Sequence, residues 1–264
     1  MSDNIDNARH ADEKWTEIEH LPQWDEEFYN VYTAKKFGKW LMLKALKSEL
    51  RDDPKYQSMI EKEFDVRYNL AHPNIVMIND FEDVPGIGRC IITDDVYGDS
   101  LAKLLKEGKV TEANLDKITH GLVDALDYIQ TNHIVHHPLR PETIIFTENV
   151  GNLKMIDVGF DQREHLTPAD ASEDIYNYGK VLATVLDALP DKHLDALPDK
   201  HPHLRRVAER CTDPNPKHRY RDIQNLKLAL ANSSANRLYI MIIAFLVVML
   251  GILAWLNVNP PAAY

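Results

Sequence analysis

Two side chains capable of ionic chemistry lie far apart in the sequence. Lys44 interrupts the apolar run LMLKALK, and Asp157 lies two residues before Gly159 in LKMIDVGF. A lysine within a strand can form an ion pair with a neighbouring element, and an aspartate shortly before a glycine is typical of a turn. What these residues do therefore depends on the elements that bring them together.

Three histidines accompany an internal repeat. The octapeptide LDALPDKH occurs at Leu186–His193 and again at Leu194–His201, and His203 follows shortly after. Histidines bind metal ions, but no cysteine or carboxylate pair stands at ligand spacing beside them. We interpret the duplication as an insertion in a surface loop, where added residues are tolerated.

The first half of the chain has the pattern of a strand-rich unit. Residues 1–20 are polar and charged and are expected to form a disordered leader. Runs rich in branched and aromatic residues, separated by turn residues, predict strands; they lie at 29–36, 40–47, 75–83 and 89–96. Apolar residues at helical spacing predict a helix within 54–72.

The second half is mostly helical. Apolar residues recur at helical spacing after Thr111, and Ser172 is expected to cap a helix that continues towards Leu189. A last amphipathic helix is expected over 220–231. A small strand-rich half followed by a larger helical half predicts an α+β fold.

An apolar stretch follows the last amphipathic helix. Residues 238–256 carry no charge, and nineteen helical residues span roughly 28 Å, close to the hydrocarbon thickness of a bilayer. We therefore expect a transmembrane helix over 238–258, followed by a short tail, 259–264. Arg237 precedes the stretch and no basic residue follows it, which predicts a single-pass membrane protein with its N-terminal domain in the cytoplasm.

Composition narrows the classes of partner. The formal net charge of −11 argues against nucleic acid as a ligand, because phosphate backbones attract basic surfaces. Cys90 and Cys211 are the only cysteines, and in a reducing compartment they are expected to be free buried thiols.

Seven segments, in order over roughly residues 24–232, resemble those of the eukaryotic-type Ser/Thr protein kinase family. The similar segments are LMLKALK, EKEFDVRYNLAHPNIV, IITDDVYGDSL, IVHHPLRPETIIF, LKMIDVGF, SEDIYNYGKVL and CTDPNPKHRY. Each alone is a weak signal, but their order and spacing together are specific. The resemblance implies a bilobal domain over 21–232, with an N-lobe of about 24–96 and a C-lobe of about 97–232.

The resemblance also implies roles for individual residues. Lys44 would hold the α- and β-phosphates of ATP, and Glu63 would pair with it. Thr93 would be the gatekeeper, and the hinge that accepts adenine would run from Asp94 to Val96. Asp157 would bind Mg²⁺. Asp174 and Arg219 would stabilise the large lobe.

The sequence departs from the family where phosphate is transferred. The glycine-rich loop should fall at Trp24, Glu26 and Tyr29, where bulky or acidic residues stand in place of glycines. The catalytic loop reads HHPLRPET, so Pro138 takes the place of the base, Thr143 that of the second metal ligand and Arg140 that of the phosphate-contacting lysine. His137 is a weak candidate for a substitute base.

These departures favour a membrane-anchored pseudokinase that acts in signalling as a cytoplasmic binding or regulatory module with protein partners. In this interpretation ATP and Mg²⁺ bind weakly or not at all. Two alternatives remain open: an active, atypical Ser/Thr kinase, for which Lys44, Glu63 and Asp157 argue, and a membrane-tethered adaptor without a ligand.

Overall fold

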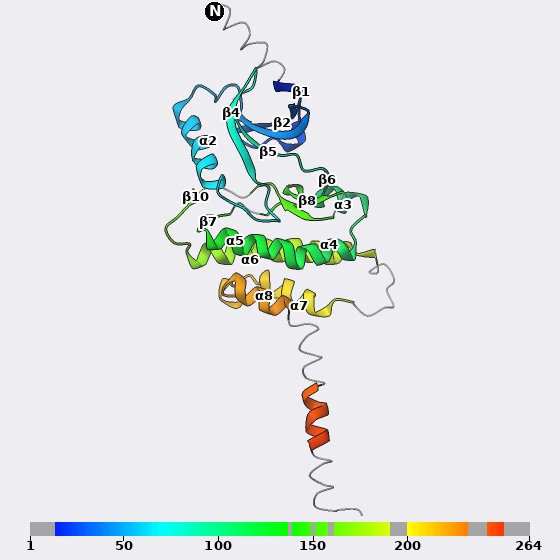
Figure 1. The fold of residues 1–264 in the computed structure, drawn as a ribbon. Helices are drawn as coiled ribbons and strands as arrows, with labels where there is room; N and C mark the ends of the chain where they lie inside the picture. The colour runs from blue at the N-terminus through cyan, green and yellow to red at the C-terminus, as the bar shows by residue number, and fades with distance from the viewer. Residues whose placement is uncertain are drawn as a thin grey trace, which may run out of the picture.

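The described residues form two lobes stacked along the long axis of the molecule (Figure 1). The computed structural model describes residues 14–136, 139–148, 151–157, 161–190, 200–231 and 242–250. The upper lobe is a twisted sheet with one helix against it, and the lower lobe is built mainly of helices. The predicted bilobal α+β architecture is confirmed.

The upper lobe contains a five-stranded antiparallel sheet in the order β1-β2-β3-β5-β4. Its strands are β1 (Trp15–His20), β2 (Tyr29–Lys36), β3 (Lys39–Leu46), β4 (Ile78–Val84) and β5 (Gly88–Asp94). The part of the expected leader that forms β1 is thus not disordered: Trp15 is buried in the core of the sheet and its strand pairs with β2.

Helix α2 (Pro54–Arg67) covers one side of this sheet. The carboxylate of Asp53 accepts a hydrogen bond from the backbone N–H of Lys55 at 2.8 Å, and Pro54 occupies the first turn, so the helix begins with a side-chain cap. Ile60 packs into a cluster with Tyr29 and Ile91 of the sheet. The packed face of α2 also carries Glu63 and Arg67, which lie one helical turn apart and point to the junction between the lobes.

The lower lobe has one large hydrophobic core, contained mainly between helices. Its helical elements are α3 (Leu101–Glu107), α4 (Glu112–Lys117), a π-helical turn (Ile118–Leu122), α5 (Val123–Thr131), α6 (Pro168–Ala188), α7 (Pro202–Cys211) and α8 (Ile223–Ala231). Helix α6 begins earlier than predicted. Thr167, and not Ser172, caps it, and the side chains of Thr167 and Asp170 form a capping box.

Short strands carry the residues at the top of the lower lobe. Strands β6 (Gly98–Ser100), β8 (Ile144–Thr147) and β9 (Leu153–Met155) form a three-stranded sheet, and β7 (Ile134–Val135) pairs with β10 (Asp161–Gln162). The backbone of Val76 donates to the carbonyl of Met155 at 2.9 Å, which ties the segment after α2 to β9. The end of β9 therefore lies beneath the sheet of the upper lobe.

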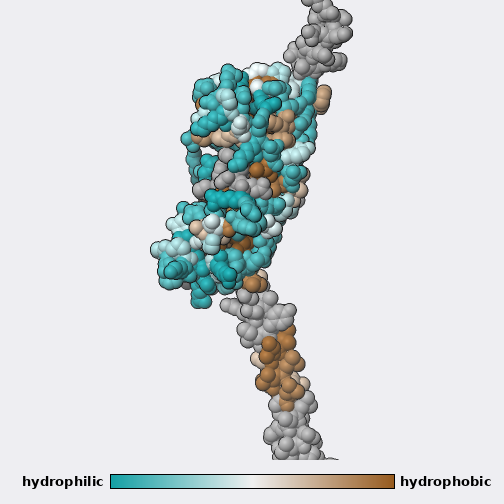
Figure 2. All heavy atoms as spheres, turned by 90° about the vertical axis from the view of Figure 1, so that its left-hand side faces the viewer, coloured by the Kyte–Doolittle hydropathy of each residue, from teal (hydrophilic) through white to brown (hydrophobic). Residues whose placement is uncertain are grey.

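The prediction of a transmembrane helix is wrong for the chain as described. Among the described ranges, none of the helices combines the length and the apolar character that crossing a bilayer requires. Within the expected span of 238–258, the structure describes only the exposed helix 242–250, brown in Figure 2. At about 1.5 Å per residue, these nine residues cover less than half of a hydrocarbon core of about 30 Å. The predicted single-pass membrane localisation is corrected with it.

Candidate functional site

Strand register brings the first predicted site residues onto one face of the upper sheet. Lys44 pairs with Val31 of β2 and Ile91 of β5, while Met42 pairs with Thr93 of β5. Side chains two residues apart on a strand point to the same side, so Met42 and Lys44 share a face. This face forms the roof of a cleft between the lobes.

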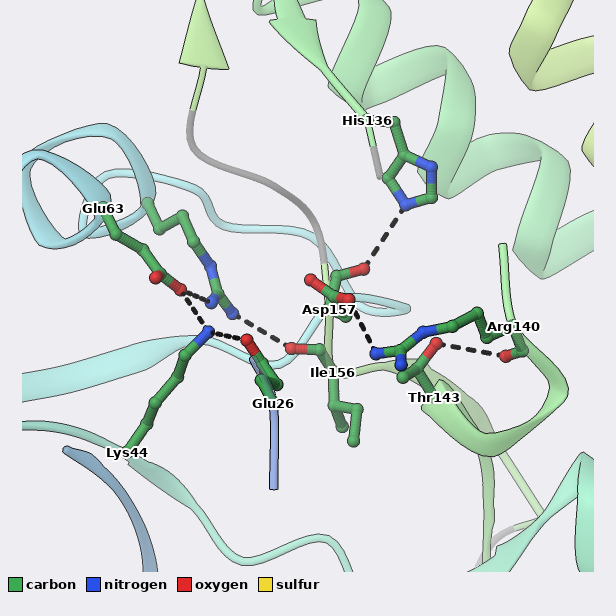
Figure 3. Close-up of polar contacts among 9 residues, drawn as sticks. Glu26, Lys44, Glu63, His136, Arg140, Thr143, Ile156 and Asp157 are labelled. Atoms are coloured by element: carbon green, nitrogen blue, oxygen red, sulfur yellow. Dashed lines mark hydrogen bonds and ion pairs between the residues drawn. The ribbon is translucent and has the colours of Figure 1, made fainter. Parts of the chain in front are cut away.

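Lys44 lies between two carboxylates (Figure 3). Its ammonium is 3.0 Å from Oε1 of Glu63 on α2 and 2.7 Å from Oε2 of Glu26, which precedes β2. The ring of Tyr29 lies 4.2 Å from the same ammonium. The predicted Lys44–Glu63 pair is therefore formed, and Glu26 completes it in the place that the family resemblance assigns to a glycine-rich loop.

Arg67 extends this network across the junction between the lobes. Its guanidinium donates to Glu63 at 2.6 Å and to the backbone carbonyl of Ile156, next to Asp157, at 3.2 Å. Both Arg67 and Glu63 are almost completely buried. One arginine thus links α2 to the segment that carries Asp157.

The buried charges in this network stabilise one another. Burial opposes ionisation of Glu63, but Lys44 and Arg67 outweigh it and hold the pKa of Glu63 below its ordinary value. Burial likewise disfavours the charge on Lys44, and the carboxylates of Glu63 and Glu26 outweigh it and raise the pKa of Lys44. Burial and the neighbouring Glu63 raise the pKa of Tyr29. Glu63 and Lys44 are therefore ionised at neutral pH, and Tyr29 is protonated.

Local hydrogen bonds fix the segment that presents Glu26. One carboxylate oxygen of Asp25 accepts from the backbone N–H of Val31 at 2.9 Å, and the same carboxylate contacts the imidazole of His20 at 2.9 Å. The backbone N–H of Glu26 donates to the carbonyl of Tyr29 at 3.0 Å. The consecutive acids thus differ: Asp25 closes the turn, Glu26 points into the cleft and Glu27 is exposed.

Trp24 narrows the part of the cleft next to the hinge. It packs against a cluster of Val76, Val96 and Ile145, which lies between the hinge and β8. The cleft lined by Trp24, Glu26, Lys44 and Thr93 retains only about 50 Å³ of free space. Sites for drug-sized molecules or cofactors have roughly 300–1,000 Å³, so the pocket bounded by these described residues is by itself smaller than a nucleotide site.

Asp157 pairs with a cation on its other side. The guanidinium of Arg140 donates to Oδ2 of Asp157 at 3.1 Å, and His136 lies 3.3 Å from the backbone carbonyl of Asp157. The hydroxyl of Thr143 donates to the carbonyl of Arg140 at 3.1 Å (Figure 3). Thr143 therefore stabilises the loop that carries Arg140.

The structure brings together most of the site residues that the sequence predicts. Lys44, Glu63 and Thr93 lie at or beside the cleft, with Val96 behind it. The side chain of Asp94 faces outward, where it accepts from Lys39 at 2.7 Å and from Asn79 at 2.9 Å. The backbone of Asp94, and not its side chain, is thus the part of the residue that can contribute to the hinge. Pro138 and His137 lie outside the described residues.

Sequence reasoning missed two contributions to the site. No role was predicted for Arg67, although its position four residues after Glu63 on a predicted helix indicates an ion pair between the two side chains. Glu26 was expected to repel phosphate, but its bond to Lys44 was not foreseen. That bond depends on the turn before β2, which Asp25 closes.

A family model described as "Protein kinase domain" matches residues 27–178, more than half of the chain. The chain belongs to the protein kinase domain family. The match includes the segments that carry Lys44, Glu63 and Asp157.

Known relatives are serine/threonine kinases. A "probable serine/threonine-protein kinase" of Streptomyces coelicolor is 27% identical over 195 residues, which cover 62% of this chain and 28% of the relative. Serine/threonine-protein kinase 36 of Pongo abelii is 32% identical over 102 residues, which cover 38% of this chain and 8% of the relative. The chain thus matches less than a third of the length of either protein.

Solved structures support the fold. The kinase domain of Mycobacterium tuberculosis PknI matches with a TM-score of 0.60 at 19% identity, over 83% of this chain and 96% of that domain. At this identity the likeness concerns the fold alone.

Kinase domains in general use ATP and Mg²⁺, and the residues of this cleft fit them poorly in the conformation described. The carboxylate of Glu26 forms an ion pair with the Lys44 ammonium, which would otherwise bind phosphates. Trp24 helps to fill the space beside the hinge. Asp157 is bound to a cation already, and Thr143 lacks the amide oxygen of the usual second metal ligand. The described residues also include no group of three or more acids, histidines or cysteines suited to a metal.

Proposed function

We propose that the chain is a pseudokinase: a kinase-fold module in signalling that binds or regulates a protein partner and transfers little or no phosphate. The observation that carries the proposal is the bond of 2.7 Å between Lys44 and Glu26. Phosphoryl transfer depends on positioning and on electrostatic stabilisation of the phosphates. A lysine already neutralised by an internal carboxylate contributes less to both.

Three further departures support the proposal. Pro138 stands in the place of the catalytic base and cannot accept a proton. Arg140 is paired with Asp157, and Thr143 uses its hydroxyl within its own loop. General acid–base and electrostatic contributions are each typically worth roughly 10²-fold or more in rate. Their combined loss leaves a very slow enzyme, whereas the fold itself remains intact.

The test is a transfer assay with radiolabelled ATP, Mg²⁺ and a generic protein substrate, with an unrelated active kinase as the positive control. We expect incorporation at background level for the full chain. Incorporation that disappears in both Lys44→Ala and Asp157→Ala would refute the proposal.

Such a result would establish the second candidate function, an active atypical Ser/Thr kinase. The observation in its favour is the Lys44–Glu63 bond of 3.0 Å, because this pair must be in place for transfer in active kinases. In that case the segment with Trp24 and Glu26 has to leave the cleft during turnover.

A further inference from the structure

The cleft holds an internal counterpart for each charged part of a metal-bound phosphate chain. The carboxylate of Glu26 contacts Lys44, where a phosphate would lie, and the guanidinium of Arg140 contacts Asp157, where a metal ion would lie (Figure 3). The two contacts come from different segments, one before β2 and one before β8. The two contacts have no residue in common, so each can be removed separately by mutation.

Of the two carboxylates that contact Lys44, that of Glu26 is the one that an incoming anion can replace. Its side chain is 24% exposed, whereas that of Glu63 is 2% exposed. Backbone and Asp25 contacts hold its turn, and among the described residues its carboxylate pairs with one cation, Lys44. An incoming anion would thus replace the carboxylate of Glu26 at the Lys44 ammonium, while the buried ion pair between Glu63 and Arg67 stays intact.

The charges that remain after such an exchange favour an anion. Among the described residues, the carboxylates that remain paired with Lys44, Arg67 and Arg140 are then those of Glu63 and Asp157. In active kinases, metal ions bridge the phosphates and neutralise their charge. Here a guanidinium already lies on the metal-binding aspartate, and guanidinium groups bind phosphate oxygens in bidentate geometry.

We infer that Arg140 replaces the divalent metal, so that this cleft takes a nucleoside polyphosphate without metal, in competition with the carboxylate of Glu26. The inference rests on the proposed function, because it concerns binding at a site that does not transfer phosphate. Trp24 lies two residues before Glu26, and its side chain also has to turn aside, since it helps to fill the space beside the hinge that a base would need.

Competition by Glu26 sets the size of the expected effect. A charged hydrogen bond contributes enough to change an equilibrium constant by about 10- to 100-fold. Removing the charge with Glu26→Gln should therefore tighten nucleotide binding by at least about tenfold. Glu27→Gln is the matched control, because Glu27 has the same chemistry on the neighbouring, exposed position.

The experiment measures ATP binding to the full chain by isothermal titration calorimetry, once with EDTA and once with Mg²⁺. We expect Glu26→Gln to bind at least about tenfold more tightly than both the unmodified chain and Glu27→Gln, with equal affinity in the two buffers. The double variant Glu26→Gln/Arg140→Gln should bind ATP in EDTA at least about tenfold more weakly than Glu26→Gln alone. Adenosine, which lacks phosphates, should not respond to either substitution.

Three results would overturn the inference. Binding by Glu26→Gln that requires Mg²⁺ would show that Asp157 still holds a metal. Binding in EDTA that is unchanged by Arg140→Gln would show that Arg140 is not the phosphate partner. Absence of binding in every variant with an unchanged melting temperature would show that the cleft takes no nucleotide, and would leave the proposed lack of phosphate transfer untouched.

A second variant protects the test against a folding defect. If Glu26→Gln melts at a lower temperature than the unmodified chain, Glu26→Ala replaces it with the same expectations. Transfer of phosphate by the unmodified chain is measured separately, so failure of the proposed function and failure of this inference are distinguishable.

Discussion

Replacing Arg67 with methionine tests whether the buried ionic network holds the two lobes together. Arg67 is 4% exposed and donates to Glu63 at 2.6 Å and to the carbonyl of Ile156 at 3.2 Å. Methionine has a similar length but cannot donate, so Glu63 stays buried with Lys44 as its remaining buried cation. We expect Arg67→Met to lower the free energy of unfolding by a substantial fraction of its total.

The magnitude follows from the desolvated carboxylate. Breaking a buried ion pair costs about 3–5 kcal/mol, because the remaining charge is left without compensation. Lys44 compensates part of this loss, so we expect a cost of about 3 kcal/mol. At about 2–4 °C per kcal/mol for a domain of this size, the melting temperature should fall by about 6–12 °C. Lys62→Met, on an exposed part of the same helix, should change the free energy of unfolding by less than about 1 kcal/mol, the usual contribution of an exposed ionic contact.

A double-mutant cycle provides the decisive comparison, measured by urea unfolding followed by circular dichroism. In Glu63→Met/Arg67→Met no buried carboxylate is left behind, and Lys44 keeps Glu26. The double variant should therefore be more stable than the sum of the two single costs implies, by about 1–3 kcal/mol. Additive costs would refute the idea that Arg67 acts through Glu63.

Two further predictions concern other buried groups. Burial raises the pKa of Asp174 to about 7, so the folded chain retains a proton that the unfolded chain releases near its ordinary pKa of about 3.9. The contribution of Asp174 to the free energy of unfolding should therefore fall as the pH rises from about 4 to 7. Asp174→Asn should remove this part of the dependence of the free energy of unfolding on pH, measured by urea unfolding between pH 5 and pH 7.5. Identical pH dependence in the two proteins would contradict the assignment. Cys90 and Cys211 are free and buried, and burial raises the pKa of each thiol to about 12. Both should resist iodoacetamide at pH 8 until the chain unfolds, and rapid labelling of the native chain, read by mass spectrometry, would count against this packing.

The sequence by itself determined the family and the outline of the fold. Periodicity placed most strands and helices, because burial of one face imposes a period of two or of about 3.6 residues. Ordered motifs identified Lys44, Glu63 and Asp157, whose types and spacing suit one chemistry. The apolar stretch after Arg237 shows the limit of this reasoning, because composition alone predicted a membrane-spanning helix, whereas none of the described helices has both the length and the apolar character that this requires.

Only the tertiary structure decided which charges neutralise which. Glu26 and Lys44 are eighteen positions apart, and nothing local predicts their bond of 2.7 Å; it arises because Asp25 closes the turn before β2 and directs the next side chain into the cleft. The contact between Arg140 and Asp157 likewise depends on β8 and β9 lying side by side. Ion pairs of this kind form between elements that packing brings together. Electrostatic attraction depends on distance in space and on burial, and the order of residues in the sequence specifies neither directly.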